Sequence, residues 1–142
     1  MSPAEVDAFL AEQRTCRVAT LGPDGPHATP LWYCWDGRCL WLYSIIRSRR
    51  WAELRADPRA GVVVDDGREY LELRGVELTG VAEVVGDVPR TGSPRPELAV
   101  VERLFAAKYL GAEQMYHDGR HGWLRVMPAT LVSWDFGKLA QL

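Results

Sequence analysis

Apolar positions near the N-terminus recur at the spacing of an α-helix. The residues that follow this pattern are Val6, Phe9 and Leu10. Ser2 and Glu5 stand three apart just before the pattern, as in a capping box, and Pro3 occupies the first turn. The spacing therefore predicts a short amphipathic helix over residues 3–13.

Alternating and continuous apolar runs follow between residues 15 and 44. Gly22-Pro23-Asp24-Gly25 and Asp36-Gly37 interrupt these runs, and both are strong turn signals. Short apolar runs joined by tight turns pair with their neighbours. This part of the chain is predicted to form a meander of three antiparallel strands.

Helical spacing returns over residues 48–56 and stops at Asp57-Pro58, since the residue before a proline avoids the helical region. The alternation over residues 60–66 and beyond predicts a hairpin that leads into a long strand. Glycines at 75 and 80 lie within that strand. They predict a bend or bulge, which a small barrel needs in order to close.

The last third of the chain contains a loop, a helix and more strands. Residues 86–96 hold three prolines and two glycines, which predicts a mobile loop. Residues 97–110 carry an apolar stripe and predict a helix. Residues 121–136 predict two strands joined at Met127-Pro128. The fold class expected for residues 1–142 is a single, mainly β domain (α+β): a six- to seven-stranded antiparallel barrel with short flanking helices.

Composition narrows the function class. The formal net charge of the 142 residues is −2, which argues against a nucleic-acid partner. No apolar run approaches the roughly 20 residues that cross a bilayer, and the N-terminus lacks a secretory pattern. We therefore expect a cytoplasmic protein that does not bind a membrane. Three cysteines lack the spacing of metal ligands, so no metal site and buried, reduced thiols are expected. These are Cys16, Cys34 and Cys39.

A basic cluster marks the junction between the third predicted strand and the next helix. Arg47, Arg49 and Arg50 surround Ser48. A helix N-terminus attracts anions, and arginine suits phosphate or carboxylate. Three arginines at the positive end of a helix are unfavourable unless an anion offsets them. A solvated helix end capped by Ser48 is the alternative, and local chemistry leaves both open.

Neighbouring residues would extend an anion site. Tyr43 and Ser44 precede the cluster on the same strand, and His27, Thr29 and Pro30 lie on the adjacent one. Taken alone, Thr29 is an ordinary strand residue and His27 an exposed strand start. His117 and His121 belong to a Gly-rich segment and are interpreted as loop residues. No Ser/His/Asp order, paired carboxylates or phosphate loop is present, so the catalytic residues are unknown.

Four segments in this order carry a family resemblance. They are RVATLGPDGPHATPLWYCWDGRCLWLYS, SRRWAELRADPRAGVVVDD, ELTGVAEVV and WLRVMPATLVSWDFGK. Together they resemble the pyridoxamine 5′-phosphate oxidase-like split β-barrel family, which binds FMN. Within it, the chain is most similar to the flavin/deazaflavin oxidoreductases, which include enzymes dependent on coenzyme F420. The likeness extends from about Thr15 to Lys138.

This resemblance implies a homodimer with cofactor sites at the subunit interface. The phosphate or acidic tail of the cofactor would be held by Ser44, Arg47, Ser48, Arg49 and Arg50, next to Tyr43. The ring would be bordered by residues of the second strand, which are His27, Ala28, Thr29 and Pro30. Trp123 and Trp134 would contribute from the partner chain or pack in the interface.

The implied activity is hydride transfer between the cofactor and a small organic substrate. The arginines favour coenzyme F420, whose tail carries a phosphate and several carboxylates, over FMN. A composition rich in Arg, Ala, Gly and Val and poor in Lys points the same way, because it resembles actinobacterial proteins. The chain lacks the C-terminal arginine–histidine segment of the vitamin-B6 enzymes and carries arginines where the family often has lysine. A cofactor carrier, sensor or haem-binding relative without turnover is the alternative.

Overall fold

The computed structural model describes all 142 residues. Its first element is helix α1, Pro3–Glu12, whose N-cap is Ser2. The Ser2 hydroxyl accepts a hydrogen bond from the Glu5 amide, and the Glu5 carboxylate accepts one from the Ser2 amide. The predicted capping box and helix are thus confirmed.

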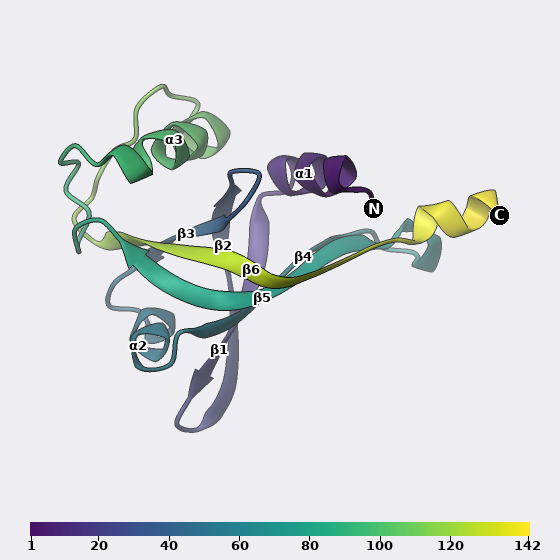
Figure 1. The fold of residues 1–142 in the computed structure, drawn as a ribbon, viewed down its shortest axis with the longest axis horizontal. Coiled ribbons are helices and arrows are strands. Elements are labelled where there is room, and N and C mark those ends of the chain that lie inside the picture. Colours follow the sequence, from purple (N-terminus) through teal and green to yellow (C-terminus); the bar gives the residue numbers. More distant parts are fainter.

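Six antiparallel strands close into a barrel (Figure 1). They are β1 Thr15–Gly22, β2 Gly25–Trp35, β3 Leu40–Ile45, β4 Arg59–Asp66, β5 Arg74–Val85 and β6 His121–Asp135. The order around the barrel is β1-β2-β3-β6-β5-β4, and β4 pairs back with β1. The first three strands form the predicted meander, and the predicted antiparallel barrel is confirmed.

Strand β6 corrects one prediction. Residues 121–135 form one continuous strand, whereas two strands joined at Met127-Pro128 were expected. Thr79 pairs with Thr130 and Gly80 with Pro128, so Ala129 is an extra residue on β6. This bulge accommodates a proline, which cannot donate to the ladder, without ending the strand.

The two glycines of β5 act differently. Gly80 lies at the bulge, as predicted, and a Cβ there would collide with the Met127 carbonyl oxygen. The register is regular at Gly75, so no bulge forms there. A side chain at Gly75 would instead meet the indole of Trp134. Gly75 is therefore required for close packing between β5 and β6.

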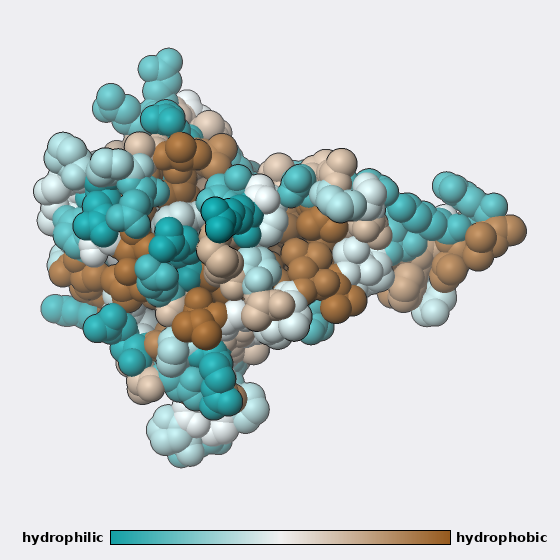
Figure 2. Space-filling model, in the orientation of Figure 1, coloured by the Kyte–Doolittle hydropathy of each residue, from teal (hydrophilic) through white to brown (hydrophobic).

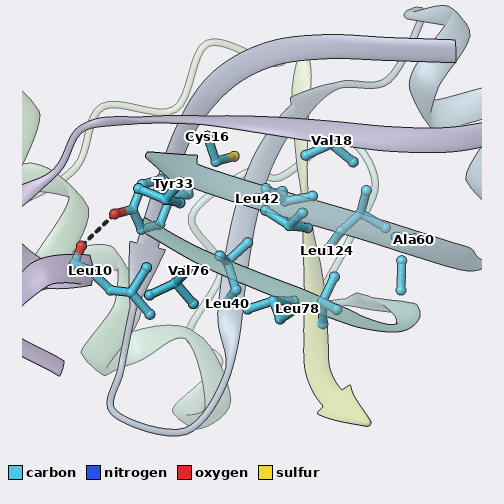
Figure 3. Packing of buried hydrophobic residues seen from close by; sticks show 14 of the residues in the cluster. Leu10, Cys16, Val18, Tyr33, Leu40, Leu42, Ala60, Val76, Leu78 and Leu124 are labelled. Atoms are coloured by element: carbon cyan, nitrogen blue, oxygen red, sulfur yellow. Dashed lines mark hydrogen bonds between the residues drawn. The ribbon is translucent and has the colours of Figure 1, made fainter. Parts of the chain in front are cut away.

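Buried apolar side chains from all six strands fill the barrel, and Figure 3 shows how those that it labels converge. They include Val18, Leu40, Leu42, Val62, Leu78 and Leu124. Tyr33 is fully buried, and its hydroxyl donates a 2.6 Å hydrogen bond to the Leu10 carbonyl, which ties α1 to β2. The three cysteines are buried and unpaired, as predicted.

Helices flank the barrel on two sides. Helix α2, Arg49–Ala56, follows β3, and α3, Pro96–Phe105, continues as a π-helical turn at Ala106–Leu110. Both helices were predicted. Helix α3 packs on β3 and β6 through a second apolar cluster, which includes Trp41, Leu98, Val101, Phe105 and Trp123. No helix is both long and apolar enough to cross a membrane.

Residues 86–95 contain no helix or strand, as predicted for this loop. Arg90 anchors it, because this side chain is almost fully buried and forms ion pairs with Asp87 and Glu102. The predicted mobility of the loop stays a prediction.

The far ends of β5 and β6 project from the barrel as an arm (Figure 1). The short 3₁₀ helices Tyr70–Glu72 and Phe136–Gln141 pack together on this arm. Several large apolar or aromatic side chains of the arm are exposed, namely Tyr70, Leu71, Leu131, Val132 and Leu139. Figure 2 shows hydrophobic residues at the tip of the arm.

Candidate functional site

The junction between β3 and α2 is built by a serine cap. The Ser48 hydroxyl accepts a 3.1 Å hydrogen bond from the Trp51 amide and donates a 2.7 Å bond to the Ile45 carbonyl. Both partners are backbone groups, so Ser48 sets the direction in which α2 leaves the barrel. The predicted role of Ser48 as the N-cap of α2 is therefore confirmed, and its hydroxyl already has two backbone partners.

The three arginines of the cluster point to three different environments. Arg49 is 55% exposed and forms an i,i+4 ion pair with Glu53 at 2.7 Å. Arg47 is exposed and lines one cavity. Arg50 is buried and lines another. The structure does not gather these side chains into one patch, and Arg50 alone is held inside the protein.

Arg50 is anchored by hydroxyl groups only. Its Nε and Nη2 donate to Ser44 Oγ at 3.2 and 3.1 Å, and its Nη1 donates to Thr29 Oγ1 at 2.7 Å. No carboxylate forms an ion pair with it. A guanidinium carries five N–H donors, so two remain after these three bonds.

Burial of this charge is unfavourable in the chain by itself. Burial lowers the pKa of Arg50, because removal from water disfavours the charged form. Neutral hydroxyls orient the guanidinium but do not compensate its charge. The arrangement therefore favours binding of an anion at the two free N–H groups.

Arg50 faces a cavity of about 470 Å³ between the barrel and the α3 side of the molecule. Its walls come from β2, β3, α3 and the segment before β6, and most of the lining residues are apolar. They are Pro30, Leu31, Trp32, Tyr43, Ile45, Phe105, Leu110, Met115 and Tyr116, with the polar residues Arg50, Asp118 and His121. We call it the Arg50 cavity. A planar, apolar ligand with an anionic group matches this lining.

Tyr43 lines the Arg50 cavity and carries an unsatisfied polar group. Its hydroxyl is buried without a hydrogen-bond partner, and burial raises the pKa of the phenol. The ring is fixed by stacking on His121, with centroids 4.5 Å apart and planes within 9°. A buried polar group without a partner is uncommon in folded proteins.

A second cavity, of about 610 Å³, lies beside the first and shares Ile45 with it. Arg47 and Arg120 line it, together with Ile46, Pro89 and Gly119. Two guanidinium groups on one cavity, without a lining carboxylate, create a positive local potential. We call it the Arg47 cavity.

The predicted ring-binding residues on β2 separate into different surroundings. Thr29 binds Arg50, and Pro30 lines the Arg50 cavity. His27 faces α2, where its Nδ1 lies 3.0 Å from Glu53 Oε1 but outside hydrogen-bonding geometry. Ala28 pairs with Ala19 of β1. Neither His27 nor Ala28 lines either cavity.

The two tryptophans lie outside both cavities within one chain. Trp123 is fully buried, and its Nε1 donates a 3.0 Å hydrogen bond to Glu102. Trp134 packs on Gly75 in the arm, near the other end of β6. A contribution of either residue from a partner chain stays a prediction.

His121 was missed at the sequence level, where it was interpreted as a loop residue. It is the first residue of β6 and pairs with Ile45 of β3, which brings it onto the wall of the Arg50 cavity. Its Nδ1 lies 2.9 and 2.8 Å from the two carboxylate oxygens of Asp118. Only the β3–β6 register reveals this position, because no sequence motif marks the pair.

Comparison with known proteins agrees with this fold. The family model described as pyridoxamine 5′-phosphate oxidase matches residues 2–135. The crystal structure of the conserved hypothetical protein Rv2991 from Mycobacterium tuberculosis is 33% identical, with a TM-score of 0.78 over 99% of this chain and 88% of that one. No curated protein matches significantly.

Two more distant structures share the fold. A FAD-binding protein from Mesorhizobium loti is 19% identical, with a TM-score of 0.70 over 94% of this chain and 92% of that one. A protein described as an F420 reductase is 23% identical, with a TM-score of 0.65 over 89% and 94%. The closed antiparallel barrel and the match over residues 2–135 together show that this chain belongs to the pyridoxamine 5′-phosphate oxidase family.

Proposed function

We propose that this protein is an oxidoreductase that binds coenzyme F420 or FMN through Arg50 and transfers a hydride to or from a small organic substrate. The observation that carries the proposal is Arg50, a buried guanidinium that faces a largely apolar cavity without a carboxylate partner. Family members described as FAD-binding and as an F420 reductase support a flavin-type ligand.

The residues present fit such a cofactor. Its phosphate would take the two free N–H groups of Arg50, which Ser44 and Thr29 already orient. The aromatic and aliphatic wall of the Arg50 cavity suits a flat, conjugated ring. When bound, the cofactor would supply the hydride chemistry, and the protein would supply orientation and exclusion of water.

The Arg47 cavity favours coenzyme F420 over FMN. A deazaflavin coenzyme carries several carboxylates beyond its phosphate, whereas the charge of FMN ends at the phosphate. Arg47 and Arg120 would bind the additional carboxylates in the neighbouring cavity. Arg49 is already paired with Glu53 and is expected to contribute little.

We further propose that the protein is a homodimer. The arm projects from the barrel with exposed apolar side chains on β6 and on both of its short helices. An apolar surface of this kind is usually covered by a partner. A second copy would cover the arm and bring Trp134 toward a neighbouring barrel.

Coenzyme titration of the purified protein tests the function. We expect quenching of coenzyme F420 fluorescence at micromolar concentration, with weaker binding of FMN. Arg50→Met should weaken binding about 10- to 150-fold, since a hydrogen bond to a charged group contributes about 1.5–3 kcal/mol.

Arg49→Met is the matched control and should bind normally, because Arg49 faces solvent and Glu53. Equal losses in the two variants would contradict the assignment of the anion site to Arg50. Absence of binding to either coenzyme would overturn the proposal. Binding without reduction of any acceptor would favour a carrier or sensor.

A further inference from the structure

Two histidines lie near the candidate site, and their surroundings differ. His117 Nε2 is engaged by Glu102 at 2.8 Å, within the ion-pair group of Arg90. His121 has Nδ1 on Asp118, and its Nε2 makes no hydrogen bond within the chain. His121 lines the Arg50 cavity and His117 does not. One imidazole thus has a nitrogen available to a ligand.

Asp118 determines which nitrogen of His121 carries the proton. Burial by itself would raise the pKa of this carboxyl. Hydrogen bonds from His121 and from the Arg120 amide outweigh it and hold the pKa below its usual range. The carboxylate is therefore charged at neutral pH and accepts from Nδ1–H. This leaves Nε2 as the ring nitrogen that has no hydrogen-bond partner within the chain.

Stacking fixes the plane of the same imidazole. The Tyr43 ring lies parallel to it at 4.5 Å and is itself packed against Phe105 and Trp123. The ring therefore has a carboxylate on one nitrogen and an aromatic face against it. Two independent contacts of this kind orient a side chain for chemistry.

We infer that His121 is the proton-transfer residue of the Arg50 cavity, positioned by Asp118 and Tyr43. This inference rests on the proposed function and deepens it. It assigns an acid–base group to a site in which the sequence indicated none. It also restricts the substrate class to compounds whose reduction requires a proton as well as a hydride.

For an enone or a quinone, the bound reduced coenzyme would supply a hydride, which is two electrons and one hydrogen, to one atom of the substrate's conjugated double bonds, and would itself be oxidised. Nε2–H of the protonated His121 breaks, and its proton forms the O–H or C–H bond at the complementary atom. Neutral His121 keeps Nδ1–H on Asp118. Its side chain is 23% exposed, so solvent returns the proton.

The test begins with protein loaded with reduced coenzyme F420 or FMN, and uses cyclohexenone and menadione as acceptors. His121→Phe retains a ring against Tyr43 but has no ring nitrogen that could carry a proton. We expect its turnover to fall about 100-fold while KM and coenzyme affinity stay close to wild type. Asp118→Asn should show a smaller loss. His117→Phe is the matched control and should keep the wild-type rate.

A spectroscopic measurement supplies a readout without turnover. In the free protein, ¹⁵N NMR of the imidazoles should show His121 as the Nδ1–H tautomer, and Asp118→Asn should reduce that population. An Nε2–H tautomer in the wild type would overturn the inference.

The outcomes separate the two proposals. Failure of the wild type to bind coenzyme or to reduce either acceptor would overturn the proposed function. Wild-type turnover that persists in His121→Phe would overturn only the role of His121.

Discussion

Two arginines are buried in this protein, and they have opposite surroundings. Arg90 is 3% exposed and Arg50 is 9% exposed. Arg90 donates to Glu102 from Nε and Nη2, and to Asp87 and the Ser93 carbonyl from Nη1. Arg50 donates to two hydroxyls and to no carboxylate.

The difference is visible in the direction of the pKa shifts. Hydrogen bonds from Arg90 to Glu102 raise the pKa of Arg90. Burial lowers that of Arg50. The first charge is compensated within the chain, whereas the second has no carboxylate partner. Burial alone therefore does not make an arginine a candidate anion site, whereas burial beside a cavity without a carboxylate does.

The strongest test of this contrast is to remove each guanidinium. Arg90→Met leaves Glu102 and Asp87 without their cation, and we expect the free energy of unfolding to fall by about 3 kcal/mol. Arg50→Met removes a buried charge that has no counter-ion. Its free energy of unfolding should therefore fall by less than about 1 kcal/mol or rise. Urea denaturation measures both, and equal losses would contradict the difference in charge compensation between Arg90 and Arg50.

Coenzyme binding should stabilise the folded state through Arg50. At a concentration 100 times Kd, coenzyme F420 or FMN should add about 2.7 kcal/mol to the free energy of unfolding of the wild type. At the same concentration Arg50→Met should retain half of this or less. Arg49→Met should retain all of it. The same increase in all three proteins would place the anion elsewhere.

Acid should weaken the ion pair between Arg90 and Glu102, because protonation removes the charge of the carboxylate. Burial by itself would raise the pKa of Glu102, but hydrogen bonds from Arg90, His117 and Trp123 outweigh it and leave the pKa below the ordinary value of 4.5. A carboxyl group whose pKa is lowered in the folded state stabilises the protein at pH values above the ordinary pKa. This stabilisation is lost as the pH falls through the lowered pKa.

Glu102→Gln removes this titration. Its free energy of unfolding should be lower than that of the wild type at pH 7, and should fall less steeply between about pH 5 and pH 3. Thermal unfolding across this range measures the slopes. Parallel slopes would show that Glu102 has the same pKa in the folded and unfolded states.

The smallest expected effect concerns the orientation of Arg50. Thr29→Val keeps the shape of the side chain and removes one hydrogen bond to the guanidinium. We expect coenzyme binding to weaken by about 1 kcal/mol, measured by fluorescence titration. Ala28→Val, at the neighbouring position outside the cavities, is the control. No change in Thr29→Val would show that Ser44 alone orients Arg50.

The sequence predicted most of the elements because their signals are local. The capping box of α1, the turns after β1 and β2 and the stop at Asp57-Pro58 each act within a few residues. The interpretation of Pro128 as a strand boundary failed for a different reason. Its missing donor is accommodated by a bulge opposite Gly80, and this pairing joins distant parts of the chain.

The antiparallel barrel, the family resemblance and the basic junction after β3 could all be predicted from the sequence. Only the tertiary structure distinguished Arg50 from Arg47 and Arg49, since burial and counter-ions depend on elements far apart in sequence. The same holds for His121, which reaches the Arg50 cavity because β6 pairs with β3. Local propensity specifies strands and turns, whereas the compensation of a charge is decided by which strands meet.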